Sequence, residues 1–388
     1  MRILHTSDWH LGRTFGPMSL VDDQQAFLDW VVDECATRQV HLVAIAGDIF
    51  DRAIMPTESL ELFVRTLHRL RATGAVVAAI TGNHDGAVRV AAYDSLLDAS
   101  GVHLRGGYAR VGEVVHLEFA DGPLDLVLLP FLDPQAAPDD FTDTTVAADD
   151  DVVQRRVHRN HQSVLAAATD AARASLCAPR SLAIAHAYVS GGTTSESERL
   201  LTVGGTGQVD ASVFHGFSYT ALGHLHRPQH ISPTVRYSGT PLAYSFSEDH
   251  AKSITIVDLD PNGGCVVHEL AVPPTVGRPV HTVVGTMAEL LAMPTDQHAF
   301  VRAIVTDRDT VLDAKARLSS VFPHIVEVKL QPPMDISPGG DIANDVRELP
   351  QLEATLRFWE QAEGREPDAL TATLLHDIVD HAVQQVTA

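Results

Sequence analysis

Residue types that bind divalent cations recur in five short blocks between positions 8 and 226. The candidate ligands are Asp8, His10, Asp48, Asn83, His186, His224 and His226. Carboxylates, imidazoles and an amide favour Mn²⁺, Fe²⁺ or Zn²⁺ over Ca²⁺, which prefers shells made of oxygen alone. Seven ligands are too many for one ion, but they suit two octahedral ions completed by water. Because two such ions about 3.5–4 Å apart polarise a phosphoryl group and orient its attack, this pattern predicts hydrolysis of a phosphate ester.

Each block lies at the end of a predicted strand, which is the second reason for grouping these residues. The strands are predicted at Arg2–Thr6, His41–Ala46, Ala75–Ile80, Leu182–Ala187 and Tyr219–Leu222. Taken singly, an aspartate that caps a loop or a structurally satisfied histidine is a more common reading than a metal ligand. Strand ends of an α/β sheet converge on one edge, however, so five such blocks favour a single shared site.

The elements that position these residues alternate between strands and helices near the start of the chain. Helices are predicted at Asp22–Arg38 and Pro56–Thr73, the second with a proline near its first turn. This β-α-β-α-β order favours an α/β fold. Further strands are predicted at His116–Phe119, Leu124–Pro130, Val235–Ser238, Ile254–Asp258 and Cys265–Leu270, several of them in antiparallel meanders. Together these elements predict a mixed two-sheet sandwich with helices outside.

Two segments between the strands carry opposite charge. Residues 134–151 are acidic and rich in Pro, Asp and Thr, which is typical of a solvated loop. The predicted helix Val152–Ser175 that follows is basic, with Arg155, Arg156 and Arg159 near its start. This helix could face DNA or could present an ordinary solvated face, and the sequence gives neither reading an advantage.

The C-terminal third reads as a separate module followed by a tail. Beyond Pro273-Pro274, a strand-helix-strand-helix-strand order is predicted at Val280–Val284, Met287–Ala292, Phe300–Thr306, Val311–Val321 and Ile325–Leu330. Pro338-Gly339-Gly340 lies in a second linker. The tail, residues 345–388, is acidic and helical in pattern, with Phe358-Trp359 and an apolar stripe that could dock on a partner. The predicted domains are therefore 1–273, 274–333 and 334–388.

Composition limits the classes of protein that remain. The 388 residues are 45% hydrophobic and 20% charged, as in a globular protein, and no apolar run is long enough to span a membrane. We therefore expect a cytoplasmic protein. Cys35, Cys177 and Cys265 form no C-x-x-C pair or zinc spacing, and we interpret them as ordinary buried thiols. The net charge of −22 argues against nucleic-acid binding unless bound cations or a partner protein offset it.

The motif order resembles the calcineurin-like metallophosphoesterases. The blocks are Ser7-Asp8-Trp9-His10, Gly47-Asp48-Ile49-Phe50-Asp51-Arg52, Gly82-Asn83-His84-Asp85, His186 and Gly223-His224-Leu225-His226. More narrowly, Thr194–Arg199, Val203-Gly204-Gly205, Ala221–Gln229 and Tyr237–Pro241 look like the SbcD family of nuclease subunits. Members of that family carry a small capping module and a helical tail that holds the ATPase subunit SbcC. The resemblance implies an αββα metallophosphoesterase sandwich with an α/β capping domain and a helical C-terminal tail.

The resemblance also implies residue roles. One metal ion would be held by Asp8, His10, Asp48 and His226, and the other by Asp48, Asn83, His186 and His224. His84 would be the catalytic histidine, because an imidazole can act as a general acid near neutral pH, and Asp85 would orient its ring. Asp51 and Arg52 would support the site from outside the ligand set.

Mn²⁺ is favoured as the metal, with Mg²⁺, Fe²⁺ and Zn²⁺ as alternatives. His5, His41, His68, His103, His116, His215, His230 and His250 match no block, and we do not expect them to bind metal.

Three functions remain open on this basis. The first is a DNA nuclease, an exonuclease on double-strand ends and an endonuclease on single strands or hairpins, acting with an SbcC-type ATPase in repair and recombination. The second is a small-molecule phosphodiesterase or phosphatase with the same two-metal centre, and the third is a scaffold for the ATPase. The family further implies a homodimer, a heterotetramer with SbcC, association with the nucleoid, and no membrane. A helical segment near Ser95–Ser100 is a candidate for the dimer contact.

Overall fold

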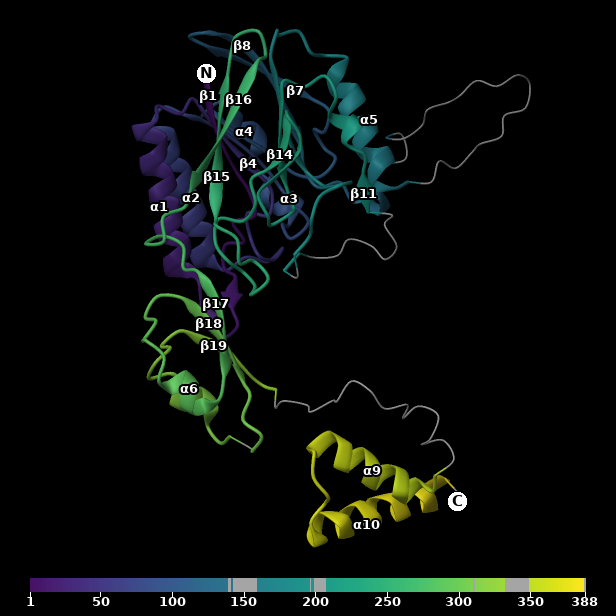
Figure 1. The fold of residues 1–388 in the computed structure, drawn as a ribbon. Coiled ribbons are helices and arrows are strands. Elements are labelled where there is room, and N and C mark those ends of the chain that lie inside the picture. Colours follow the sequence, from purple (N-terminus) through teal and green to yellow (C-terminus); the bar gives the residue numbers. More distant parts are fainter. Residues whose placement is uncertain are drawn as a thin grey trace, which may run out of the picture. The chain divides into compact units, whose positions relative to one another are not determined.

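Two six-stranded sheets pack together and carry helices on their outer sides (Figure 1). In this computed structural model, residues 1–138, 141, 159–195, 197–198, 207–309, 311–331 and 349–386 are described. The first sheet contains, in spatial order, β16 (Cys265–Ala271), β15 (Ser253–Leu259), β1 (Arg2–Thr6), β4 (Leu42–Ala46), β5 (Val76–Ile80) and β6 (Val102–Arg105). The second contains β13 (Gln229–Ser232), β14 (Val235–Tyr237), β12 (Tyr219–Gly223), β9 (Ser181–His186), β8 (Gly122–Leu129) and β7 (Val114–Phe119). The predicted α/β two-sheet sandwich is confirmed.

The first sheet is parallel where the predicted β-α-β-α-β order runs. β1, β4, β5 and β6 pair in parallel, and β15 and β16 extend the sheet with antiparallel pairs. Helices α1 (Val21–Thr37) and α2 (Thr57–Ala72) cover one face. Along β4, Val43 and Ile45 join the core beneath these helices, whereas Leu42 and Ala44 face the second sheet. Such a strand is buried on both faces, which is why its sequence is a continuous apolar run.

The expected antiparallel pairing is found in the second sheet only at its outer strands. β8, β9, β12 and β14 pair in parallel with one another, and only the outer pairs β7–β8 and β13–β14 are antiparallel. Parallel neighbours need a crossover, and helix α5 (His161–Arg173) lies in the connection between β8 and β9. A capping box between Asn160 and Ser163 starts this helix, whose buried face packs on the second sheet.

A separate apolar core lies between the two sheets. It combines side chains of β1, β4 and β5, among them Ile3 and Ile80, with side chains of β8, β9 and β12, among them Leu126, Ile184 and Tyr219. These five residues are fully buried. The packing fixes the two sheets against each other, so loops at the ends of both sheets can contribute to one site.

Several short elements were not predicted. They are β2 (Thr14–Phe15), β3 (Met18–Ser19), α3 (Ala87–Val90), β10 (Tyr188–Val189), β11 (Gln208–Val209), and the 3₁₀ turns at Pro134–Ala136 and Ala211–Phe214. The sixth strand of the first sheet, β6, and strand β13 of the second were also missed. Helix α4 (Asp94–Asp98) matches the helical segment expected near Ser95–Ser100.

The C-terminal region has the predicted alternation of elements. Its order is β17 (Val280–Gly285), α6 (Met287–Leu291), β18 (Phe300–Val305), α7 (Ala314–Leu318) and β19 (Ile325–Leu330), and the strands form one sheet in the order β17-β18-β19. By contacts, the chain divides into two compact units. One holds Met1–Thr282, Asp296–Arg302 and His324–Glu327, and the other holds Val283–Thr295, Ala303–Pro323 and Val328–Ala388.

The tail forms two helices, α9 (Gln351–Glu363) and α10 (Ala369–Val386), as its pattern predicts. Phe358 on α9 and Leu370, Leu374 and Ile378 on α10 are exposed. No helix of the described residues is long and apolar enough to cross a membrane. Most of the predicted acidic loop 134–151, the first residues of the basic helix (152–158), the segment 199–206 and the Pro338-Gly339-Gly340 linker lie outside the described residues.

Candidate metal centre

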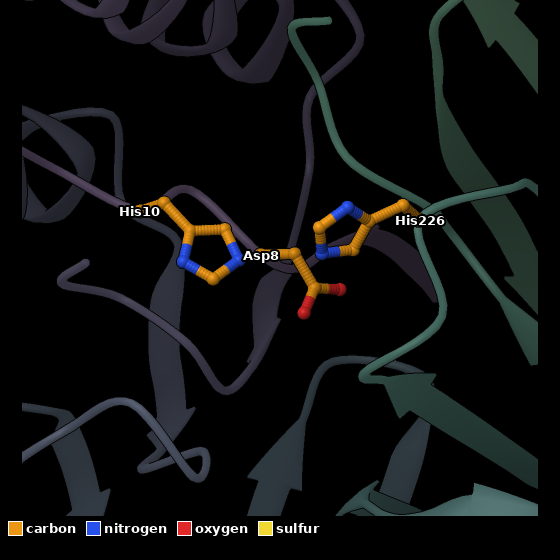
Figure 2. A group of neighbouring side chains, drawn as sticks. All are labelled: Asp8, His10 and His226. Atoms are coloured by element: carbon orange, nitrogen blue, oxygen red, sulfur yellow. The ribbon is translucent and has the colours of Figure 1, made fainter. Parts of the chain in front are cut away.

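All seven predicted ligands meet at the carboxyl ends of the two sheets. The first sheet supplies Asp8 and His10 after β1, Asp48 after β4 and Asn83 after β5, and the second supplies His186 at the end of β9 with His224 and His226 after β12. Asp8, His10 and His226 each offer one ligand atom within 4.8 Å of the others, and so do Asp8, Asp48 and His186. Figure 2 shows the rings of His10 and His226 on either side of the Asp8 carboxylate.

Asn83 connects the remaining ligands to this group. Its Oδ1 lies 3.0 Å from Nε2 of His186 and 3.1 Å from Nδ1 of His224. Asp48 lies between the two sets of residues, because its Oδ1 is 3.6 Å from Nε2 of His186 and its Oδ2 is 3.7 Å from Nε2 of His10. This carboxylate is therefore placed where it could bridge two ions.

Unpaired buried atoms indicate that these residues fit a metal. Both ring nitrogens of His10 are buried and have no hydrogen-bond partner, and the Nδ2 atom of Asn83 has none either. Leaving a buried polar atom without a partner costs about 1–3 kcal/mol, so native proteins rarely do it without a reason. A cation bound by an imidazole nitrogen of His10 would supply such a reason for that residue.

Two histidines have their ring orientation and tautomer fixed by neighbours. Nδ1 of His186 donates to the carbonyl oxygen of Ala46 at 2.8 Å, which leaves the lone pair of Nε2 free. Nδ1 of His226 lies 3.1 Å from Oε1 of Glu248 and 2.7 Å from the hydroxyl of Ser197. Metal-binding histidines characteristically use one nitrogen for the ion and the other for such an oxygen partner.

The electrostatics of the cluster favour bound cations. Burial and the neighbouring Asp48 raise the pKa of Asp8 well above its ordinary value, because two carboxylates share a site that excludes water. Burial lowers the pKa of His10 and His224 well below the ordinary value, so both imidazoles are neutral, which is the form that binds metals. Divalent cations at this position would offset the repulsion between the carboxylates.

The backbone at the ligands is held in an unusual conformation. Asp8, His10, Asp48 and His224 have φ angles of 53°, 44°, 47° and 111°. In the part of the chain that is described, only Gln39 and Asp313 share a positive φ among residues other than glycine. Left-handed conformations cost a residue with a Cβ roughly 1–3 kcal/mol and cluster at functional sites. The surrounding fold therefore maintains strain at four of the seven ligands.

Two glycines allow the ligand loops to approach one another. A Cβ on Gly82 would overlap Oδ1 of Asp48, and a Cβ on Gly47 would overlap the ring of His186. Gly47 also has a φ of +88°, which disfavours any side chain. Glycine at these positions lets the loop after β5 lie against Asp48 and the loop after β4 lie against His186.

The structure places His84 beside His10 and Asp48 but corrects the expected contact with Asp85. Nδ1 of His84 donates to the carbonyl oxygen of Asp51 at 2.9 Å, and its Nε2 lies 4.0 Å from Oδ2 of Asp48. The Asp85 carboxylate instead accepts from the backbone N–H groups of Gly82, Ile49 and Phe50 at 2.8–3.1 Å. Asp85 therefore ties the loop after β5 to the loop after β4, and the carbonyl of Asp51 orients the imidazole.

The two outer residues of the second block differ in exposure. Asp51 lies near the cluster, with its Oδ1 3.9 Å from Nδ1 of His10 and 3.4 Å from a guanidinium nitrogen of Arg13. Arg52 is largely exposed, and its guanidinium lies 3.5 Å from Oδ2 of Asp51. Arg13, which the sequence analysis did not single out, also stacks over the ring of Tyr244.

Sequence reasoning missed a buried network behind His226. Glu248 contacts His226, accepts from the Thr240 hydroxyl at 2.8 Å and forms an ion pair with the nearly buried Lys252. Glu198 accepts from the backbone N–H of His226 at 2.6 Å. Ser197 and Glu198 lie in the segment Thr194–Arg199, whose resemblance to the SbcD family could have drawn attention to them. No spacing pattern marked Glu248 or Lys252.

Comparison with known proteins identifies the family. The model of the calcineurin-like phosphoesterases matches residues 1–144, and the SbcD_C model, described as the type 5 capsule protein repressor C-terminal domain, matches residues 276–363. The SbcD subunit of nuclease SbcCD from Bacillus subtilis strain 168 is 33% identical over 345 residues, which cover 85% of each chain. The chain belongs to the SbcD family. The SbcD proteins of Staphylococcus epidermidis and Staphylococcus saprophyticus are 27% and 30% identical, over 84% and 67% of this chain and 84% and 66% of their own.

The two family models match different parts of the chain and leave residues 145–275 between them. The calcineurin-like model includes the blocks with Asp8, Asp48 and His84, so the chain is a phosphoesterase that depends on divalent metal ions. His186, His224 and His226 lie beyond it, within the region aligned to SbcD relatives along most of both chains. The SbcD_C match runs from the residues just before β17 to the end of α9.

Proposed function

We propose that this chain is the metal-dependent DNA nuclease subunit of an SbcCD-type complex. It would cleave phosphodiester bonds as an exonuclease on double-strand ends and as an endonuclease on single strands or hairpins. The observation that carries the proposal is the meeting of the seven candidate ligands where strand ends of the two sheets come together, in a chain of the SbcD family. The relatives compared above are named as parts of the nuclease SbcCD, which supports a nucleic acid as the substrate.

The proposed metals are two divalent ions, with Mn²⁺ first and Mg²⁺, Fe²⁺ and Zn²⁺ as alternatives. One ion would be bound by Asp8, His10, Asp48 and His226, and the other by Asp48, Asn83, His186 and His224. When bound, the pair would polarise the phosphate and activate water. The distances from Asp48 to His10 and to His186 support its role as the shared ligand.

His84 is the proposed catalytic residue of the protein itself. With Nδ1–H donated to the Asp51 carbonyl, the other side of the ring directs Nε2 toward the ligand cluster. A protonated Nε2 there can donate to a phosphate oxygen or protonate the leaving 3′ or 5′ oxygen. Asp85 positions the loop that carries His84, and Asp51 and Arg52 support the site from its rim.

Partner binding forms a second part of the proposal. The exposed apolar residues Phe358, Leu370, Leu374 and Ile378 on α9 and α10 support docking of an SbcC-type ATPase on the tail. Three further exposed residues on and beside α3 and α4 support a homodimer: Val88, Tyr93 and Leu96. Such a dimer would give a heterotetramer with SbcC.

The proposed domains are 1–273 for catalysis, 274–333 for capping and 334–388 for binding the ATPase. DNA as substrate implies a cytoplasmic, nucleoid-associated protein.

The acidic charge predicts how DNA binding should behave. With a net charge of −22, the isolated chain should bind DNA weakly and lose affinity steeply as salt rises. Metal ions at the cluster and basic surface on the ATPase would supply the missing attraction. Nanomolar binding by the isolated chain at physiological salt would contradict this part of the proposal.

The deciding experiment is cleavage of end-labelled linear duplex DNA by the purified chain with Mn²⁺, Mg²⁺ or EDTA. We expect Mn²⁺-dependent shortening that is absent from the His84→Ala variant. A simple aryl phosphodiester is assayed in parallel. Rapid turnover of that ester with DNA untouched, even after addition of an SbcC-type ATPase, would favour the small-molecule phosphodiesterase. DNA processing that is unchanged in His84→Ala would favour a scaffold.

A further inference from the structure

A second cluster of metal-binding residue types lies outside the catalytic site. His116 on β7, Asp125 on β8 and Cys177 in the segment before β9 each offer one ligand atom within 4.8 Å of the others. Nδ1 of His116 lies 2.7 Å from Oδ1 of Asp125 and 3.5 Å from Sγ of Cys177, and Sγ lies 3.8 Å from Oδ1. Imidazole, carboxylate and thiol groups from three segments thus converge on one point.

These separations resemble the edges of a tetrahedral zinc site. With bond lengths of about 2.0–2.1 Å to nitrogen, 2.0–2.2 Å to oxygen and 2.3 Å to sulfur, tetrahedral geometry puts pairs of ligand atoms roughly 3.3–3.6 Å apart. The two contacts of the Cys177 sulfur are close to this range. The contact between His116 and Asp125 is a short hydrogen bond and would widen by roughly 0.6 Å around an ion.

The surrounding backbone orients the Asp125 carboxylate for metal binding. Its carboxylate is 1% exposed, and its Oδ2 accepts from the backbone N–H groups of Cys177 and Ala178 at 2.6 and 2.8 Å. These bonds favour the ionised carboxylate and leave Oδ1 directed at the other two side chains. His116 stands directly opposite Asp125 in the β7–β8 pairing. The backbone register thus sets the spacing of two of the three ligands.

The cluster is open to solvent on its other side. The His116 side chain is 56% exposed and Cys177 is exposed, so an ion could enter and take water as its fourth ligand. A simple ion pair between His116 and Asp125 needs no third group. The Cys177 thiol nevertheless lies 3.5 Å from the same ring nitrogen of His116. We propose that His116, Asp125 and Cys177 form a third metal site, for a single Zn²⁺ or another transition-metal ion of similar ligand preference.

This site is separate from the catalytic centre. Cys177 precedes the amino end of β9 and Asp125 pairs with Ser181 at that end, whereas His186 lies at its carboxyl end. The five residue-to-residue steps from Ser181 to His186 span about 16 Å. A bound ion would join the β7–β8 hairpin to the segment that leads into β9. Its role would be to brace the outer edge of the second sheet.

Titration with Co²⁺ tests the proposed site, and Co²⁺ bound at the catalytic centre does not interfere with the signal. Cysteine thiolate bound to Co²⁺ produces a charge-transfer absorption in the near ultraviolet, and none of the seven catalytic ligands is a cysteine. The full chain is reduced, freed of metal with a chelator and titrated with Co²⁺ alone. We expect the band to appear, to disappear when Zn²⁺ is added in excess, and to survive in Asp8→Ala, which removes a catalytic ligand.

Two substitutions and one matched control decide the assignment. Cys177→Ser and His116→Ala should lose the band, while Cys265→Ser, which removes a partly buried thiol elsewhere in the same fold, should keep it. Metal analysis after Zn²⁺ loading should give one ion fewer per chain in Cys177→Ser than in the unaltered protein. Absence of the band from the unaltered protein, or its persistence in Cys177→Ser, would overturn the proposal.

Discussion

Nδ1 of His226 lies 3.1 Å from the buried carboxylate of Glu248, so a residue 22 positions away sets which nitrogen of this histidine faces the metal cluster. The carboxylate accepts a hydrogen bond from Nδ1–H, and the lone pair of Nε2 is then directed to the site. The ion pair between Glu248 and Lys252 lies behind this contact. Glu248 would thus act as a positioning residue, because it contacts His226, one of the proposed ligands.

Replacing Glu248 by glutamine should weaken metal binding roughly 10–100-fold, as is typical when an outer partner of a ligating histidine is lost. The substitution keeps the side-chain shape but removes the charge that fixes the His226 tautomer and balances Lys252. Mn²⁺ affinity, measured by calorimetry, is the readout. Glu118→Gln, at an exposed position on β7, is the control. Equal Mn²⁺ affinity in the two variants would refute the positioning role.

His84→Ala should separate metal binding from hydrolysis. The residue approaches the cluster without being assigned as a ligand, so we expect two bound ions and a decrease in kcat of about 10²–10⁴-fold. Metal content is measured together with DNA cleavage under saturating Mn²⁺. His68→Ala removes an exposed imidazole on α2 and should leave both quantities unchanged. Loss of an ion in His84→Ala would instead make this residue a ligand.

Gly82→Ala should disable the site through overlap with Asp48. The added Cβ would meet Oδ1 and the backbone nitrogen of Asp48, so the loop after β5 must shift away from the shared carboxylate. We expect loss of Mn²⁺ binding and a stability decrease of about 1–3 kcal/mol. Gly74→Ala is the comparison, because its Cβ would meet nothing within 4 Å and adds only left-handed strain. The idea fails if Gly82→Ala binds Mn²⁺ normally.

Leu96→Asp should convert a dimer to a monomer if the surface around α4 is the homodimer contact. Leu96 is 71% exposed, and a charge there would be buried without a partner in such an interface. Analytical ultracentrifugation gives the mass. Leu312→Asp alters a leucine that is 76% exposed in the C-terminal region and should leave the mass unchanged. A dimer that persists in Leu96→Asp would place the contact elsewhere.

Asp98→Asn should destabilise the fold at neutral pH but not in acid. Although burial raises it, hydrogen bonds from Arg105, Arg110 and His103 hold the pKa of Asp98 at about 2. A carboxylate with a lowered folded-state pKa contributes stability that is complete above the unfolded pKa, near 4, and is lost as the pH falls through the folded value. Because Asp98 is partly exposed, we expect a difference of only about 1 kcal/mol at pH 7, decreasing between pH 4 and 2. Urea unfolding at several pH values measures it.

The meeting of the seven proposed ligand residues could be predicted because the ends of strands can be recognised in a sequence. A short apolar run followed by Asp, His or Asn gives both the strand and the edge where its loop must lie. The role of Asp85 could not be read in the same way. The partners of Asp85 are backbone N–H groups of the loop after β4. Because nearly every residue has a backbone N–H, no sequence pattern identifies the ones that Asp85 binds.

The parallel pairing at the centre of the second sheet was not predicted, although the sequence contains a signal for it. The run Leu182–Ala185 on β9 is apolar at every position, which is typical of a parallel strand buried on both faces. The meander was nevertheless predicted, because the crossover helix α5 was considered for its charge and not as a connection. The grouping of His116, Asp125 and Cys177 was not predicted, and His116 was expected not to bind metal, because a hairpin register and a crossover bring these residues together. Cys177 is also exposed, contrary to the expectation of a buried thiol.

The division of the ligands between the two sheets has a consequence for the cell. Asp8, His10, Asp48 and Asn83 come from one sheet, and His186, His224 and His226 come from the other. Neither sheet alone offers a complete shell for both ions, so a newly made chain cannot assemble the centre until residue 226 has been synthesised and the sheets have docked. An incomplete or misfolded chain would therefore lack the proposed two-metal centre, and hydrolysis would begin only after the fold is complete.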